Sequence, residues 1–457
     1  MSNLNVDILF LIFEELQYDS STRNIRNTLY SCLLVNKTWC SVIIPILWKN
    51  PWSDNTSNKN VIISHLSNEA KENLSNQIKN GKNASTILQR PLYNYVSFCK
   101  YLDFYYLDKL LFHYTRNIER SKKSFIADEI LKLFINKNSK FTHLKITSCN
   151  YDEIFLIPGA EHCFSELKVL IYYSDSDQKL LEWLTKISKS IKNFELHNCR
   201  WNSEILNLIE VQNNLNSIVC DELYGIDSYK LKILTKHNLI SLHIKSCFYL
   251  SKHLSLPNLK FLTVEYILTK NLVIIIECTK GYLTEISIDN FLDKNNRYMQ
   301  SIYQNCPNLR YLKLPLINDE VSELEILLTK CKCLVELFII GTHDGQNSLL
   351  GWDKLLNILA KSSPTNLFKF KFYFTYELPI LESFKLFLDN WKGRYPMLLQ
   401  TNIYDEDLLT LIKKYIDEGI VKSHMCGGDL IRNFHDNGYI DTDYTVITHV
   451  INKSYIV

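Results

Sequence analysis

The hydrophobic positions of the chain repeat with a nearly constant period through its middle. One apolar residue is followed by a second three positions later and by a third after two more, in the spacing L-x-x-L-x-L. The first residues of these triplets are Phe141, Leu167, Ile191, Leu215, Leu239, Leu259, Leu283, Leu309, Leu334 and Leu367. Successive triplets start 20 to 33 residues apart, and most start 24 to 26 residues apart. A period of about 20 to 29 residues with this core is typical of leucine-rich repeats.

Amphipathic stretches lie between several of these triplets. Residues 179–190, 320–331 and 349–361 carry leucines, with an isoleucine or valine in the first two, mostly at three- and four-residue steps, which predicts helices. A short strand followed by a helix, repeated about ten times, predicts an α/β solenoid with a curved parallel sheet and outer helices. Unrelated α/β elements with coincident leucines are the alternative. A doubly wound fold would need glycine-rich turns, and the chain has only 12 glycines.

A different pattern occupies the first fifty residues and predicts three helices. In the first helix the apolar positions recur at three- and four-residue steps: Leu4, Ile8, Leu9, Ile12, Phe13 and Leu16. We expect the second helix to bury Leu29, Leu33, Leu34 and Val35, and the third to include Trp39, Ile43, Leu47 and Trp48. About fifty residues form a poor independent core, so part of this apolar surface should face a partner or the rest of the chain.

The order of these residues resembles an F-box. The family pattern is roughly L-P-x-E-[LI]-L-x-x-I-F-x-x-L, then L-x-x-x-x-V-[CN]-[RK]-x-W, then a closing L-W. The matching residues are Leu4, Asp7, Ile8, Leu9, Ile12, Phe13, Leu16, Leu33, Val35, Lys37, Trp39, Leu47 and Trp48, whereas Asn5 stands where the family usually has proline. The resemblance covers about a tenth of the chain. An ordinary three-helix bundle is the alternative.

An F-box followed by leucine-rich repeats is similar to a family with many members in fungi. The resemblance implies the substrate-recognition subunit of an SCF-type (Skp–cullin–F-box) E3 ubiquitin ligase. Its F-box would bind a Skp-type adaptor, and through it the cullin and RING subunits, while the repeats would bind an unknown protein substrate. The resemblance implies these adaptor-binding residues: Leu4, Ile8, Leu9, Ile12, Phe13, Leu16, Leu34 and Trp39. The alternative function is a non-ligase scaffold for protein–protein interaction, with an F-box-like helical cap.

A second group of candidate residues lies between the apolar positions of the strands. Because side chains alternate along a strand, these residues should lie on the concave face, away from the helices. The candidate substrate-binding residues are Glu265, Glu285, Asp289, Tyr311, Lys313, Phe338, Lys369 and Lys371. We expect a basic substrate segment to cross the acidic centre, with an aromatic anchor near Tyr311 and Phe338. A merely solvated face is the alternative.

These patterns predict four regions. Residues 1–52 form the F-box and residues 53–124 a helical coupling segment, with one helix over 60–78 and many aromatic residues from 90 to 116. Residues 125–405 contain about ten repeats. Residues 406–457 form a capping segment that begins with a helix from Glu406 to Tyr415.

Composition narrows the class of protein further. The net charge of +2 without a basic block argues against nucleic acid as a partner, and no apolar run is long enough to span a membrane. The 13 cysteines form no C-x-x-C pair, and no secretory signal is visible, so we expect reduced thiols and a cytoplasmic or nuclear location.

Motifs for catalysis are absent from the sequence. It contains no phosphate-binding loop, no G-x-G-x-x-G, no G-x-S-x-G and no H-E-x-x-H. His424, Cys426 and His435 lack a fourth ligand and the usual spacing of a zinc site, so a surface turn is the better interpretation. We therefore expect no enzyme activity, no cofactor and no metal.

Overall fold

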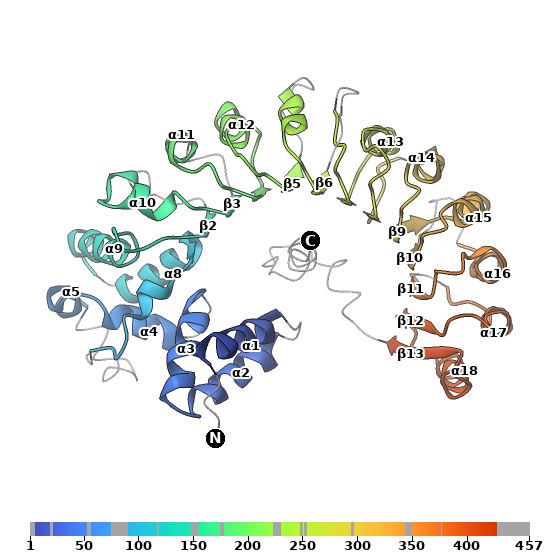
Figure 1. Cartoon of the computed structure of the whole chain (residues 1–457), viewed down its shortest axis with the longest axis horizontal. Coiled ribbons are helices and arrows are strands. Elements are labelled where there is room, and N and C mark those ends of the chain that lie inside the picture. The colour runs from blue at the N-terminus through green and yellow to red at the C-terminus, as the bar shows by residue number, and fades with distance from the viewer. Residues whose placement is uncertain are drawn as a thin grey trace. The chain divides into compact units, whose positions relative to one another are not determined.

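The computed structural model describes residues 5–18, 22–52, 56–74, 90–116, 118–147, 154–173, 178–222, 230–246, 250, 254–293, 297–342, 350–375 and 377–426. The chain divides into two compact units, Met1–Leu215 and Asn216–Val457. Both units contain parallel strands that alternate with helices (Figure 1). No helix in the described part of the chain combines the length and the apolar character needed to cross a membrane.

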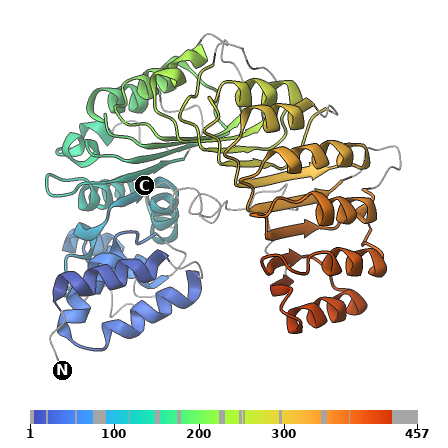
Figure 2. The same ribbon diagram turned by 45° about the vertical axis from the view of Figure 1, so that its right-hand side comes forward.

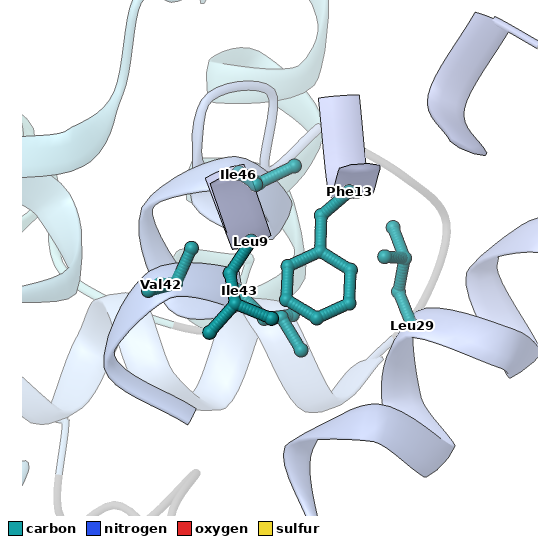
Figure 3. Packing of buried hydrophobic residues seen from close by; sticks show 6 residues of the cluster. All are labelled: Leu9, Phe13, Leu29, Val42, Ile43 and Ile46. Atoms are coloured by element: carbon teal, nitrogen blue, oxygen red, sulfur yellow. The ribbon is translucent and has the colours of Figure 1, made fainter. Parts of the chain in front are cut away.

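Unit 1 begins with the three predicted helices, α1 (Val6–Tyr18), α2 (Thr22–Leu33) and α3 (Lys37–Trp48). The side chain of Asn36 accepts a hydrogen bond from the Trp39 N–H at 2.8 Å, which caps the start of α3. Six buried side chains form the core between the three helices, as Figure 3 shows: Leu9, Phe13, Leu29, Val42, Ile43 and Ile46. The three helices therefore have an apolar core of their own.

The coupling segment differs from the expected single helix over residues 60–78. It contains α4 (Thr56–Ser64) and α5 (Asn68–Asn73) instead, because Ser67 leaves the helical conformation and its hydroxyl accepts from the Ala70 N–H. The next elements are η1 (Tyr95–Phe98), β1 (Tyr101–Asp103), α8 (Phe104–Thr115) and α9 (Arg120–Phe134). The segment is thus not purely helical, and α9 runs through the expected boundary at residue 124.

The remaining strands of unit 1 are β2 (His143–Ile146), β3 (Val169–Tyr173) and β4 (Asn193–His197). From β1 to β4, each strand pairs in parallel with the next one in the chain. The accompanying helices are η2 (Ile154–Leu156), α10 (Ala160–Phe164), α11 (Gln178–Ile187) and α12 (Ser203–Glu210).

Unit 2 repeats the same arrangement, with parallel strands in chain order. Its strands are β5 (Ser217–Glu222), β6 (Ser241–Ser246), β7 (Phe261–Val264), β8 (Glu285–Ile288), β9 (Tyr311–Leu316), β10 (Glu336–Gly341), β11 (Lys369–Tyr373), β12 (Met397–Thr401) and β13 (Val421–Cys426). Its helices are η3 (Lys230–Lys236), α13 (Thr269–Glu277), α14 (Arg297–Asn305), η4 (Asn318–Glu320), α15 (Val321–Lys330), α16 (Trp352–Ser362), α17 (Leu381–Asp389) and α18 (Glu406–Asp417). Helices α13 to α18 follow one side of these strands in Figures 1 and 2.

The repeating triplet explains where the core of each repeat lies. In β8, Ile286 and Ile288 are fully buried, whereas Glu285 and Ser287, which alternate with them, are partly exposed. The buried side chains face the helices. In unit 2 we call the opposite side of strands β5 to β13 the helix-free face, because the described helices α13 to α18 follow the other side. All ten predicted triplets coincide with strands, so the prediction of a solenoid-like α/β fold with a parallel sheet is confirmed.

Backbone hydrogen bonds join one repeat to the next in a regular way. At the start of a strand, one carbonyl accepts two consecutive N–H groups from the following repeat. The carbonyl of Lys260 accepts from Thr284 and Glu285, and that of Thr284 accepts from Arg310 and Tyr311. These paired bonds fix the register of neighbouring strands and therefore align the side chains of the helix-free face.

Candidate functional site

Helix α1 carries apolar side chains on two different faces. Leu9 is only 2% exposed, and Phe13 packs its ring edge-on against Trp39 with 5.2 Å between the ring centroids. Ile8 and Ile12 are exposed, and Leu11 is more exposed still. Residues i, i+3 and i+4 share a helix face, so Ile8, Leu11 and Ile12 form one apolar stripe that the core does not use.

The turn between α2 and α3 adds more exposed apolar residues, which corrects the expectation that the second helix buries Leu34 and Val35. Leu34 is 89% exposed and Val35 is also exposed, while Tyr30 near the end of α2 is partly so. An apolar side chain as exposed as Leu34 is hardly buried by its own chain, so it contributes almost no hydrophobic free energy to folding. We call Ile8, Leu11, Ile12, Leu34 and Val35 the exposed apolar set.

The structure separates the residues that the F-box resemblance assigned to adaptor binding. Ile8, Ile12 and Leu34 are exposed, whereas Leu16 and Trp39 are partly buried against the core of the three helices. Leu9 and Phe13 are core residues here, which corrects their assignment to a docking surface, because a contact with a partner would require them to leave α3. Leu4 lies outside the described residues.

Leu11 and Val35 were missing from the set expected from the sequence. The 3.6-residue period could have indicated Leu11, since it continues the stripe of Ile8 and Ile12. Which of two apolar stripes faces the core depends on the crossing of α1 with α3, and this is not encoded in the spacing of either helix alone.

The candidate substrate-binding residues of unit 2 do meet on the helix-free face. Residues of adjacent strands lie side by side in the register Glu285, Tyr311, Glu336 and Lys369. The next position along the strands places Lys313, Phe338 and Lys371 side by side. Glu265 and Asp289 directly follow the ends of β7 and β8.

Three acidic residues of this face already have basic partners on neighbouring strands. Asp289 forms an ion pair with Lys313, and Glu336 lies 2.8 Å from the Lys371 Nζ and 3.9 Å from the Lys369 Nζ. Glu265 lies 3.1 Å from the His243 Nε2. Charge on the helix-free face of unit 2 is therefore largely balanced within the described residues, and a free acidic centre is not the feature that a partner would meet.

Two aromatic side chains, Tyr311 and Phe338, also lie among the charged residues of this face. The Lys313 Nζ lies 5.2 Å from the centroid of the Phe338 ring. Burial raises the pKa of the Tyr311 hydroxyl well above its usual range, and the carboxylates of adjacent strands, Glu336 first, raise it further. Burial opposes ionisation of Glu265, but the hydrogen bond and charge of His243 outweigh it and lower the pKa of that carboxyl. The face thus offers a neutral tyrosine among paired charges, whereas Phe338 is only 7% exposed, which corrects the expectation that it anchors a partner.

Among the described residues, no three His, Cys, Asp or Glu side chains group closely enough to hold a metal ion. His424 and Cys426 lie on β13, where the His424 Nε2 is 2.9 Å from the Thr401 hydroxyl and the Cys426 thiol donates to the Ile403 carbonyl. His435 lies outside the described residues.

Comparison with known proteins identifies no family for the chain. No protein-family profile matches the chain, and no curated protein matches its sequence. Among solved structures 33 chains match, including the crystal structure of a Bacteroides fragilis protein determined by a structural genomics consortium. That protein is 15% identical, and the match covers 52% of this chain and 75% of that one with a TM-score of 0.36.

Proposed function

We propose that the chain is the substrate-recognition subunit of an SCF-type E3 ubiquitin ligase, with α1–α3 acting as an F-box. The observation that carries this proposal is the exposed apolar set. Ile8, Ile12 and Leu34 are exposed at positions where the F-box resemblance expects contact with a Skp-type adaptor. A helix that lays an apolar stripe into a groove of its partner is a recurring mode of recognition.

The energetics fit such a docking surface. Full burial of one Leu or Ile side chain contributes about 1.5–3 kcal/mol, so a few residues suffice for a specific contact. Because Leu9, Phe13 and Ile43 already hold the three helices together, the exposed set is available without unfolding. The adaptor would therefore meet a preformed surface.

The repeats would act by proximity rather than by chemistry. We propose that the helix-free face of unit 2 binds the protein substrate and holds its lysines near the ubiquitin-charged enzyme, which raises their effective concentration. The 11 cysteines within the described residues are all free thiols, which fits a reducing compartment such as the cytoplasm or nucleus.

The adaptor contact is tested with Ile12→Ala combined with Leu34→Ala in the full chain. The control is Ile326→Ala, because Ile326 lies on α15 in unit 2 and is 42% exposed, close to the 44% of Ile12. We expect co-purification with a Skp-type adaptor for the wild type and the control. The double variant should lose at least about thirtyfold in affinity while its circular dichroism is unchanged.

Two results would reject this function. If the double variant binds the adaptor as well as the control does, the exposed apolar set is not the docking surface. If the wild type recovers no Skp-type adaptor at all, a non-ligase scaffold becomes the better interpretation.

The substrate face is tested by a charge exchange that keeps its ion pair. Asp289→Lys alone would leave two cations side by side, whereas Asp289→Lys with Lys313→Asp preserves the pair and reverses its direction. We expect the exchanged variant to bind the adaptor normally but to recover less of a captured substrate. Equal recovery of substrate would exclude this part of the helix-free face as the binding surface.

A further inference from the structure

A pocket of about 360 Å³ lies in unit 1, and none of the exposed apolar set lines it. It follows one face of α8 and its C-cap, because Tyr105, Lys109, Phe112 and Arg116 are spaced by three or four residues, with His113 beside Phe112. Lys59 of α4 completes its wall. The pocket is therefore built by two helices and does not depend on a single loop.

Two of the basic side chains around this pocket have no acidic partner among the described residues. Lys59, Lys109 and Arg116 line it beside one carboxylate, Asp108, and both Lys109 and Asp108 have further interactions. Within the described part of the chain, neither Lys59 nor Arg116 forms an ion pair. This contrasts with the helix-free face of unit 2, where basic residues are matched by carboxylates on the next strand.

The pKa of the His113 imidazole also responds to these two cations. Its pKa is lowered, first by burial and then by the charges of Lys59 and Arg116. Cations that lower the pKa of a neighbouring base repel one another as well, and an anion bound between them would relieve that repulsion.

The pocket also has an aromatic part. The Lys109 Nζ lies 4.3 Å from the centroid of the Tyr105 ring, which fixes the ammonium group above that ring. Phe112 is 65% exposed, although it is large and apolar. A ligand that covered Phe112 and reached the cations would need an apolar or aromatic body with an anionic end.

We propose that this pocket binds a phosphate monoester carried on an aromatic or apolar group. A phosphate monoester has a charge of about −1.5 to −2 at neutral pH and three strong acceptor oxygens, which suits Lys59 and Arg116, the two cations without an ion pair among the described residues. Arginine binds such oxygens with two parallel hydrogen bonds, and lysine adds a point charge. The volume is at the small end of the range for ligand sites, so it suits one side chain or a small molecule. This inference is independent of the adaptor contact.

The test measures binding by calorimetry on the full chain, with phenyl phosphate as the first probe. Phenol and benzoate serve as matched ligands that lack the dianion. Lys59→Gln with Arg116→Gln should weaken binding of phenyl phosphate by at least about tenfold, and Phe112→Ala should weaken it as well. Lys122→Gln is the control, because Lys122 is exposed on α9 and does not line the pocket.

The source of the phosphate is distinguished by a second probe, a short peptide with one phosphotyrosine, measured beside its unphosphorylated form. Binding tenfold tighter than that of phenyl phosphate, and only when phosphorylated, identifies a modified protein as the ligand. Equal affinity identifies a small phosphorylated molecule. The proposal is overturned if phenyl phosphate binds no better than benzoate, or if the double variant binds it as well as Lys122→Gln does.

Discussion

At the scale of single residues, Glu320 is a buried ionisable group of unit 2. It ends η4, is only 7% exposed and accepts a hydrogen bond from the Ile317 N–H at 3.2 Å. Burial raises the pKa of its carboxyl to about 7, and the Ile317 N–H and the nearby Tyr298 hydroxyl offset this only in part. The folded protein therefore favours the protonated form of this carboxyl.

This shift predicts a dependence of stability on pH. A carboxyl whose pKa is higher in the folded state than its ordinary 4.5 stabilises the fold fully below pH 4.5. That contribution is lost as the pH rises through about 7, and it amounts to on the order of 3 kcal/mol. Glu320→Gln, which stays neutral, should remove this loss of stability with rising pH. The measurement is the free energy of unfolding in urea for the wild type and the variant between pH 4.5 and 8. If this free energy changes with pH in the same way in both proteins, Glu320 is not the group responsible.

At the scale of elements, α1 gives a prediction that separates its two apolar faces. Leu9→Ala should open a cavity against α3 and destabilise the three helices by about 2–5 kcal/mol. Ile8→Ala, one residue away on the exposed stripe, should change stability by less than about 0.5 kcal/mol. Hydrogen exchange of the amides of α3 measures both effects. Similar exchange in the two variants would show that the faces are not divided as described.

The strands show how far the sequence could predict the fold. Apolar triplets mark β2 to β11, because each buries its three apolar side chains beneath helices. The triplet spacing also fits β1, with Cys99, Leu102 and Phe104 all buried, but its first residue is a cysteine, unlike those of the ten predicted triplets. In β12 and β13 the pattern fades, since Thr401 occupies the last apolar position of β12 and His424 the middle one of β13. The edge of a repeat array needs less apolar surface, so its strands are harder to recognise.

The candidate sites were less predictable for a physical reason. Which residues of the helix-free face form ion pairs depends on the register between strands that are more than 20 residues apart. Lys313 meets Asp289, and Lys371 meets Glu336, only because the backbone hydrogen bonds align β8 with β9 and β10 with β11. A list of charges along the sequence suggested an acidic centre, whereas the folded face is largely neutralised.

At the scale of the whole molecule, each repeat of unit 2 contacts mainly the repeats beside it. Stability in such an array is close to a sum of repeat terms and nearest-neighbour terms. Leu337→Ala in the fully buried core of β10 should therefore increase hydrogen exchange most in β9, β10 and β11. The effect should be smaller in β6 and β7, and a uniform increase through unit 2 would show that it unfolds as one cooperative block.

The exposed apolar set has a consequence for the life of the protein in a cell. Leucine and isoleucine side chains left open to water on α1 and beside it favour self-association and recognition by chaperones when no partner covers them. A partner that binds only the folded chain stabilises it in proportion to its concentration. The steady-state amount of the chain should therefore follow the supply of that partner, and overproduction of the chain alone should yield aggregates rather than more active molecules.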